Sequence, residues 1–140
     1  MTREELKDVF YKYKFAEKNK NILRNRLAEI RMDMTAISSA LGNIGMPSGG
    51  GENSPKIERL ADKLLEAEKR YLTAIETFMT AEDRLHEAFA VADLTQEERN
   101  VLIDAYVYGK PAWKIANEMG WSDRTVKRRK HKAVEKLCEK

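Results

Sequence analysis

The fold is decided by residues 111–137, which read PAWKIANEMGWSDRTVKRRKHKAVEKL. A short segment with helical apolar spacing ends at Gly120, and a longer one begins at Ser122. Glycine just past one helix and serine just before the next are typical stop and start signals. Ala116 is small enough for two helices to cross closely near this turn. We therefore predict a helix-turn-helix whose last helix spans residues 122–136.

A further helix is expected just upstream, in the segment QEERNVLIDAYVYG. Thr95 and Glu98 have the spacing of a capping box, and Gly109 supplies a stop signal. Apolar residues three or four positions apart define the inward face of each helix of this module. The residues expected to face inward are Val101, Leu102, Ala105, Tyr106, Ile115, Ala116, Met119, Val126, Ala133, Val134 and Leu137.

Charge is distributed unevenly along the chain. Residues 1–93 carry 15 basic and 16 acidic side chains, whereas residues 94–140 carry 11 basic and 7 acidic ones. Six of those basic residues lie within residues 122–132. Such clustering on one short element is typical of a phosphate-binding surface, and a merely solvated basic helix face is the alternative.

The basic cluster gives specific site predictions. Side chains at the N-terminal end of a recognition helix reach base edges, and arginine suits bidentate contact with guanine. Residues further along the helix, and on the preceding helix, more often contact phosphates. We predict base readout by Arg124, Thr125, Lys127 and Arg128. The predicted phosphate contacts are Lys110, Lys114, Ser122, Arg129, Lys130 and Lys132.

A glycine- and proline-rich segment at residues 42–55, GNIGMPSGGGENSP, divides the rest of the chain. It contains five of the seven glycines and two of the three prolines, so it predicts a loop. Thr2 and Glu5 form a capping box before the first long stretch, and Ser54 with Pro55 marks the start of the second.

Both long stretches carry apolar residues at seven-residue spacing, which is typical of a coiled coil. Net charges of +3 for residues 1–51 and −4 for residues 52–93 favour pairing of the two stretches as an antiparallel hairpin. Two helices alone bury little surface, so we expect dimerisation or packing against the C-terminal module. Lys20 is the one polar member; it could set register or extend outward. The series are Leu6, Tyr13, Lys20, Leu27, Met34 and Leu41; Val9, Ala16, Leu23, Ile30 and Ile37; Ile57, Leu64, Tyr71, Phe78, Leu85 and Ala92; and Leu60, Ala67, Ala74, Ala81 and Ala88.

The expected fold is therefore all-α, with two parts. Residues 1–92 form a long antiparallel two-helix coiled-coil hairpin with the glycine-rich loop at 42–55. Residues 93–140 form a three-helix helix-turn-helix domain that binds DNA.

Enzyme chemistry finds little support in the sequence. His86 and His131 are the only histidines, and Cys138 is the only cysteine, so no metal-ligand cluster or nucleophile–base spacing exists. The three consecutive glycines lack the Lys-Ser/Thr of a phosphate-binding loop. We predict no enzyme activity, no cofactor and no metal. With no signal peptide and no membrane-spanning run, we expect a cytoplasmic protein of a bacterial host cell that does not bind membranes.

The segment LTQEERNVLIDAYVYGKPAWKIANEMGWSDRTVKRRKHKAVEKL resembles region 4 of bacterial sigma factors, which reads the upstream promoter element. The shared frame is the Leu-x-x-x-Glu-Arg-x-Val-Leu opening, then Gly, Ile-Ala, Gly, Ser, Thr-Val and Ala-x-x-x-Leu. The resemblance implies double-stranded DNA and host RNA polymerase as partners. Trp113 and Trp121 depart from the usual smaller residues, and nothing resembles the other sigma domains.

Over most of its length the chain more loosely resembles small phage or prophage regulators of the ArpU and RinA kind, with charged helices around a GMPSGGG loop. This resemblance implies a phage transcription regulator, an activator of late genes, in a Gram-positive host. A homodimer through the helical hairpin fits the same interpretation.

Two other functions stay open at this point. The hairpin could bind a host transcription factor or polymerase, with the C-terminal module serving only as a docking surface. Alternatively, the protein could be a DNA-packaging component, because small phage terminase subunits also join a helix-turn-helix to long helices. Sequence-specific binding near a promoter would favour regulation, and ring-shaped oligomers would favour packaging.

Overall fold

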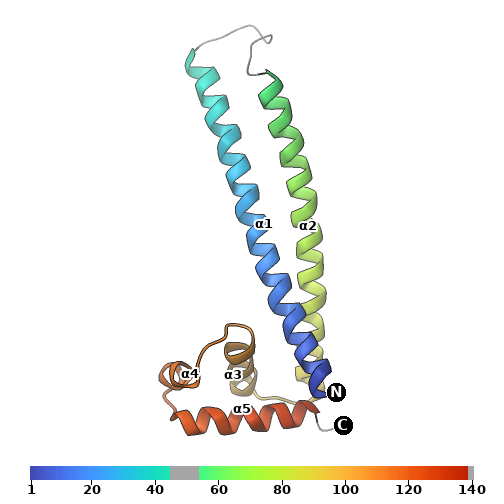
Figure 1. Cartoon of the computed structure of the whole chain (residues 1–140), viewed down its shortest axis with the longest axis vertical. Coiled ribbons are helices and arrows are strands. Elements are labelled where there is room, and N and C mark those ends of the chain that lie inside the picture. Colours follow the sequence, from blue (N-terminus) through green and yellow to red (C-terminus); the bar gives the residue numbers. More distant parts are fainter. Residues whose placement is uncertain (45–53, 139–140) are drawn as a thin grey trace. The chain divides into compact units, whose positions relative to one another are not determined.

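The computed structural model describes residues 1–44 and 54–138, and in this part of the chain it contains five α-helices and no strand (Figure 1). The prediction of an all-α protein is therefore confirmed. Two long helices precede three short ones. The helices are α1 (Arg3–Ile44), α2 (Ser54–Val91), α3 (Gln96–Tyr106), α4 (Ala112–Met119) and α5 (Asp123–Cys138).

The two long helices begin close to the residues that the sequence indicated. The backbone N–H of Glu5 donates to Thr2 Oγ1 at 3.1 Å, and the N–H of Thr2 donates to Glu5 Oε2 at 3.3 Å, which completes a capping box. α1 ends at Ile44, slightly beyond the predicted loop start at residue 42. Of the predicted loop, residues 45–53 lie outside the described residues.

The heptad positions predict the burial of the long helices well. Every described member of the four seven-residue series is buried or half-buried, including Lys20. In α2 the most buried members of one series are alanines, Ala67, Ala74 and Ala81. Small side chains at these positions allow the backbones of α1 and α2 to approach closely. Their helical pairing is therefore the predicted hairpin, while supercoiling of the pair stays a prediction.

The chain divides into two compact units, and each contains part of both long helices. One unit is Lys18–Thr77, in which Arg31 Nη2 lies 3.4 Å from Glu68 Oε1 across the helix pair. Its buried apolar residues, among those described, are Leu27, Ala67 and Ala74. This unit therefore has a thin core of its own.

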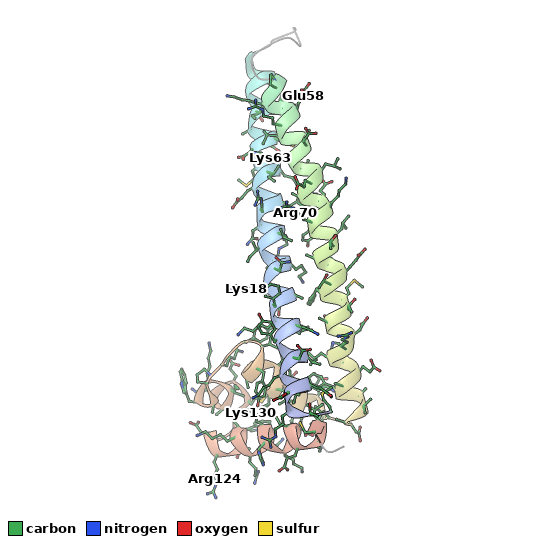
Figure 2. The ribbon with its side chains drawn as sticks, turned by 45° about the vertical axis from the view of Figure 1, so that its right-hand side comes forward. Lys18, Glu58, Lys63, Arg70, Arg124 and Lys130 are labelled. Atoms are coloured by element: carbon green, nitrogen blue, oxygen red, sulfur yellow. The ribbon has the colours of Figure 1, made fainter. Side chains whose placement is uncertain are left out.

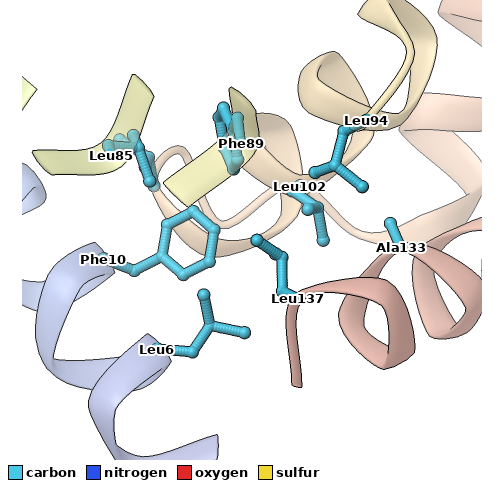
Figure 3. Packing of buried hydrophobic residues seen from close by; sticks show 9 residues of the cluster. Leu6, Phe10, Leu85, Phe89, Leu94, Leu102, Ala133 and Leu137 are labelled. Carbon is cyan, nitrogen blue, oxygen red and sulfur yellow. The ribbon is translucent and has the colours of Figure 1, made fainter. Parts of the chain in front are cut away.

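The other unit joins Met1–Glu17 to Phe78–Lys140 and has a much larger core (Figure 3). Phe89 is completely buried, and its ring lies 6.3 Å from that of Phe10. Both phenylalanines lie outside the heptad series, so the spacing did not predict their burial. The first turns of α1 and the last turns of α2 share this core with the C-terminal helices. Its buried members are Leu6, Phe10, Leu85, Phe89, Leu94, Leu102, Val107, Ala133 and Leu137.

One inward-facing prediction was wrong. Tyr106 is 40% exposed, although its ring stacks on Phe10 at 5.1 Å between ring centroids. α3 ends at Tyr106, and Val107, its C-cap, is buried instead. The chain then leaves the helix, with Gly109 in the left-handed region at φ 64°. The helix therefore stops three residues before the glycine that was expected to end it, which shifts the apolar face by one residue.

Candidate nucleic-acid interface

The turn between α4 and α5 has the backbone geometry that its sequence predicts. Gly120 adopts φ 70° and ψ 30°, a left-handed conformation that glycine enters at little cost. The backbone N–H of Trp121 donates to the carbonyl of Ala116 at 2.9 Å, which closes the end of α4. The N–H of Thr125 donates to Ser122 Oγ at 3.2 Å, so Ser122 caps α5 as predicted.

A second buried cluster fixes which face of α5 points inward. It joins Val101 of α3, Ile115 and Ala116 of α4, and Val126 of α5, all at most 2% exposed. α3, α4 and α5 contact one another pairwise, as in a helix-turn-helix. Because Val126 and Ala133 occupy the inner face of α5, the residues on the opposite side of this helix must face solvent.

The solvent-facing side of α5 is basic. Four of its cations are exposed: Arg124, Lys127, Arg128 and Lys132. Within the described chain, none of these four side chains forms a hydrogen bond or an ion pair. In Figure 2, Arg124 extends away from the other helices of the module. Lys114, near the start of α4, is also exposed and without a partner in the described residues. These five cations are free to bind phosphate or base edges.

Two predicted site residues are engaged in forming the turn. The hydroxyls of Ser122 and Thr125 lie 2.9 Å apart, and Ser122 also accepts the N–H of Thr125. Thr125 is half-buried, unlike the arginines and lysines around it. Their polar groups therefore stabilise the first turn of α5, and a DNA contact by either side chain stays a prediction.

Two of the predicted phosphate contacts form ion pairs within the module instead. Arg129 Nη1 lies 2.6 Å from Glu97 Oε2. Lys110 Nζ lies 2.9 Å from Glu118 Oε2 and 3.6 Å from Asp104 Oδ1. The hydrogen bond that Lys110 donates to Glu118, with the nearby charge of Asp104, raises the pKa of Lys110 above its ordinary value.

Lys130 differs from its exposed neighbours on α5. It is half-buried, and its ammonium lies 5.8 Å from the centroid of the Tyr106 ring. Lys130 and Arg124, both labelled in Figure 2, lie six residues apart on α5. Lys130 is therefore less available to a phosphate than Arg124, Lys127 or Arg128.

Acidic residues at the start of α3 anchor α5, which the sequence did not predict. Lys136 Nζ lies 2.9 Å from Glu98 Oε1, and Thr95 donates its N–H and hydroxyl to the same oxygen, at 3.3 and 3.1 Å. Burial alone would raise the pKa of Glu98, but the hydrogen bonds from Lys136 and Thr95 outweigh it and lower this pKa below 4.5. Glutamates in a first helical turn are ordinarily explained by capping, so only the tertiary structure identifies their partners.

The same residues line a groove of about 750 Å³ between the start of α3 and the side of α5. Glu98 Oε2 faces no hydrogen-bond partner among the described residues and is buried. Basic side chains outnumber acidic ones around the groove, so it extends the positive surface of α5. Its lining comprises Thr95, Glu97, Glu98, Arg128, Arg129, Lys132 and Lys136.

Comparison with protein families agrees with this geometry. Residues 90–139 match the family Sigma-70, region 4. The match covers about a third of the chain and includes α3, α4, α5 and every predicted site residue. It indicates a DNA-binding, transcription-related function for the C-terminal module. Comparisons with curated proteins and with solved structures found no match to the chain.

Two further findings concern sites of other kinds. In the described part of the chain, no group of three or more His, Cys, Asp or Glu residues could hold a metal ion. No helix among the described residues is both long and apolar enough to cross a bilayer.

Proposed function

We propose that this protein is a sequence-specific transcription regulator that places α5 in the major groove of double-stranded DNA. The observation that carries this proposal is the basic face of α5. Arg124, Lys127, Arg128 and Lys132 project from it without partners in the described chain, on a helix whose opposite face is locked into the module. The sigma region 4 match over residues 90–139 supports the same function independently.

We infer the role of each cation from its position along the helices. Arg124, Lys127 and Arg128 lie in the first two turns, which in a helix-turn-helix approach the base edges most closely. Lys132 lies one turn further on and Lys114 lies on α4, so both are assigned to phosphates. Arginine at 124 and 128 favours guanine at the bases they read, because its two N–H groups match guanine O6 and N7.

The proposed function is tested by selecting DNA with the purified protein. A pool of random duplexes is incubated with the full chain at near-physiological salt, and the bound fraction is recovered and sequenced. One enriched motif, bound with a discrimination that persists as salt rises, is the expected result. Enrichment of no motif, with binding that disappears as salt rises, would reduce α5 to non-specific electrostatic binding and overturn the proposal.

We further propose that the regulator is phage- or prophage-encoded, activates late genes and contacts host RNA polymerase. The support is the resemblance of the charged helices and GMPSGGG loop to ArpU- and RinA-like regulators, together with the sigma region 4 match. Tyr108 and Trp113, 56% and 58% exposed, are apolar surfaces in this module that a protein partner could cover. Transcription from a template carrying the selected motif, with and without the protein, tests activation directly.

A homodimer through the long helices completes the proposal. In the unit Lys18–Thr77, Leu65 and Leu72 lie one heptad apart on α2 and are 53% and 60% exposed. The core of this unit is limited to Leu27 and two alanines among the described residues, too little for an isolated helix pair. Pairing of this stripe with the same stripe of a second copy would bury both leucines.

A further inference from the structure

The guanidinium of Arg129 occupies a place that none of the other basic residues of α5 shares. Its Cζ lies 4.2 Å from the centroid of the Trp121 ring, and its Nη1 lies 2.6 Å from Glu97 Oε2. Trp121 belongs to the turn before α5, and Glu97 belongs to the first turn of α3. One side chain of α5 therefore contacts both α3 and the turn that precedes α5.

The two contacts act in different ways on the same group. Trp121 is half-buried and packs against the cluster of Val101, Ile115, Ala116 and Val126, so its ring is held by the core. A planar guanidinium stacks on such a ring by cation–π attraction, which an ammonium on a flexible stem reproduces poorly. Glu97 then fixes the direction of the guanidinium in the plane of the stack.

We infer that Arg129 is a positioning residue: with Trp121 and Glu97 it fixes the rotation of α5, and so the direction of Arg124 and Arg128, without binding phosphate itself. This inference rests on the proposed DNA-binding function and assigns a role in it. Arg129 is 39% exposed at its side chain, and its charge is already paired with a carboxylate. Any rotation of α5 about its axis would break the stack and the ion pair together.

A positioning role and a phosphate contact for Arg129 predict opposite effects of removing the charge of Glu97. Removing a carboxylate near a DNA-binding surface ordinarily strengthens binding, because the repulsion of phosphate falls. If Glu97 holds Arg129 in place, Glu97→Gln instead weakens binding to the selected motif. The substitution keeps the shape of the side chain, and Glu97 is exposed, so we expect the variant to fold like the wild type. Glu135→Gln removes an equal charge from the exposed face of α5 without touching Arg129 and is the matched control.

The experiment measures the affinity of five proteins, the wild type, Arg129→Lys, Arg129→Gln, Glu97→Gln and Glu135→Gln, for two duplexes. One duplex carries the motif selected by the wild type, and the other is the same sequence scrambled. We expect Arg129→Lys to lose about 2- to 5-fold in affinity for the motif, the scale of one exposed cation–π contact. Glu97→Gln should lose up to about 5-fold, the scale of one surface ion pair. Affinity for the scrambled duplex and the salt dependence should stay at the wild-type level, and Glu135→Gln should bind the motif at least as well as the wild type.

Two results would overturn the inference. If Arg129→Lys binds like the wild type and Arg129→Gln lowers the slope of log affinity against log salt by about 0.9, Arg129 contacts a phosphate. If Glu97→Gln binds the motif as well as Glu135→Gln does, Glu97 positions nothing. Should the wild type select no motif, the proposed function itself fails and the inference falls with it, a result visible in the wild type before any variant is measured.

A second measurement tests the contact without DNA. In a Trp113→Phe background, Trp121 is the only tryptophan, so the emission spectrum reports its surroundings. Arg129→Lys should shift this emission while the helical circular dichroism stays constant. An unchanged emission would show that Arg129 does not stack on Trp121 in solution and would overturn the inference.

Discussion

The carboxylate of Glu98, in the first turn of α3, lies 2.9 Å from the ammonium of Lys136, in the last turn of α5. The two residues are 38 positions apart in the chain, and Glu98 is only 7% exposed. Their contact, together with the ion pair of Arg129 and Glu97, connects α5 to α3, the helix that opens the module. The stability of the module should therefore depend on the protonation of Glu98.

Acid should weaken the module through this residue. The pKa of Glu98 is lower in the folded protein than its ordinary value of 4.5, so between the two values the unfolded chain binds more protons. The stabilisation is fully present above pH 4.5 and is lost as the pH falls through the folded pKa. Urea unfolding of the wild type between pH 7 and pH 3 should show this loss, and Glu98→Gln should reduce it.

At neutral pH, Glu98→Gln should itself cost about 1–3 kcal/mol, because the buried acceptor of the Lys136 and Thr95 hydrogen bonds loses its charge. Asp62→Asn, at an exposed position of α2, is the control. It should change neither the free energy of unfolding at neutral pH nor its loss in acid. Equal pH profiles for the wild type and Glu98→Gln would contradict the assignment.

Base readout and phosphate binding on α5 should separate by mutation. Arg124→Ala and Arg128→Ala should each lose about 1–3 kcal/mol of discrimination between the selected motif and a scrambled duplex. Lys132→Ala should weaken binding to both duplexes by the same factor. It should also lower the slope of log affinity against log salt by about 0.9. If Lys132→Ala loses discrimination while the arginine variants keep it, α5 approaches DNA in a different orientation from the one proposed.

The shared core predicts that the C-terminal module depends on the long helices. Phe89→Ala should cost about 3–5 kcal/mol of unfolding free energy, because the ring is completely buried. Val91→Ala, at a position 69% exposed on the same helix, is the control and should cost less than about 0.5 kcal/mol. Thermal and urea unfolding followed by circular dichroism measure both.

A truncated protein tests the predicted domain division at residues 92 and 93. Residues 93–140 alone lack Leu6, Phe10, Leu85 and Phe89 of the common core. The isolated fragment should therefore unfold at a lower temperature than the same helices in the full chain. A fragment as stable as the full chain would show that the module folds independently of the hairpin.

The turn before α5 should not tolerate a side chain at Gly120. A Cβ at this position meets no atom within 4 Å, so the cost of Gly120→Ala comes only from the left-handed backbone. That cost is about 1–2 kcal/mol. Asn117→Ala, exposed in α4, serves as the control, and urea unfolding distinguishes the two. An unaffected Gly120→Ala would mean that the turn relaxes to another conformation.

Self-association should depend on the exposed leucines of α2. Leu72→Glu should shift the protein from dimer to monomer in sedimentation equilibrium, because a charge would face its own copy across the proposed seam. Thr73→Glu, at the next exposed position, should leave the association unchanged. A wild-type protein that sediments as a monomer at micromolar concentration would end the dimer proposal.

The sequence by itself determined the features that depend on neighbouring residues. The capping boxes of Thr2–Glu5 and Thr95–Glu98, the turn at Gly120 and the heptad positions each follow from residues a few positions apart. Local backbone preferences and helical periodicity are enough to predict these features. The helix-turn-helix and its basic outer face follow from the same signals.

The tertiary structure alone decided which cations are free and which apolar residues are deeply buried. The sequence predicts a DNA contact for both Arg124 and Arg129, yet one projects without a partner in the described chain and the other is held by Glu97 and Trp121. Phe10 and Phe89 lie outside all four heptad series, but they are buried in the core that the long helices share with the C-terminal helices. Ion pairs and burial depend on residues tens of positions away, and no local pattern encodes their distance. Packing therefore decides which basic residues of α5 have partners within the module, whereas the sequence decides their positions along the helix.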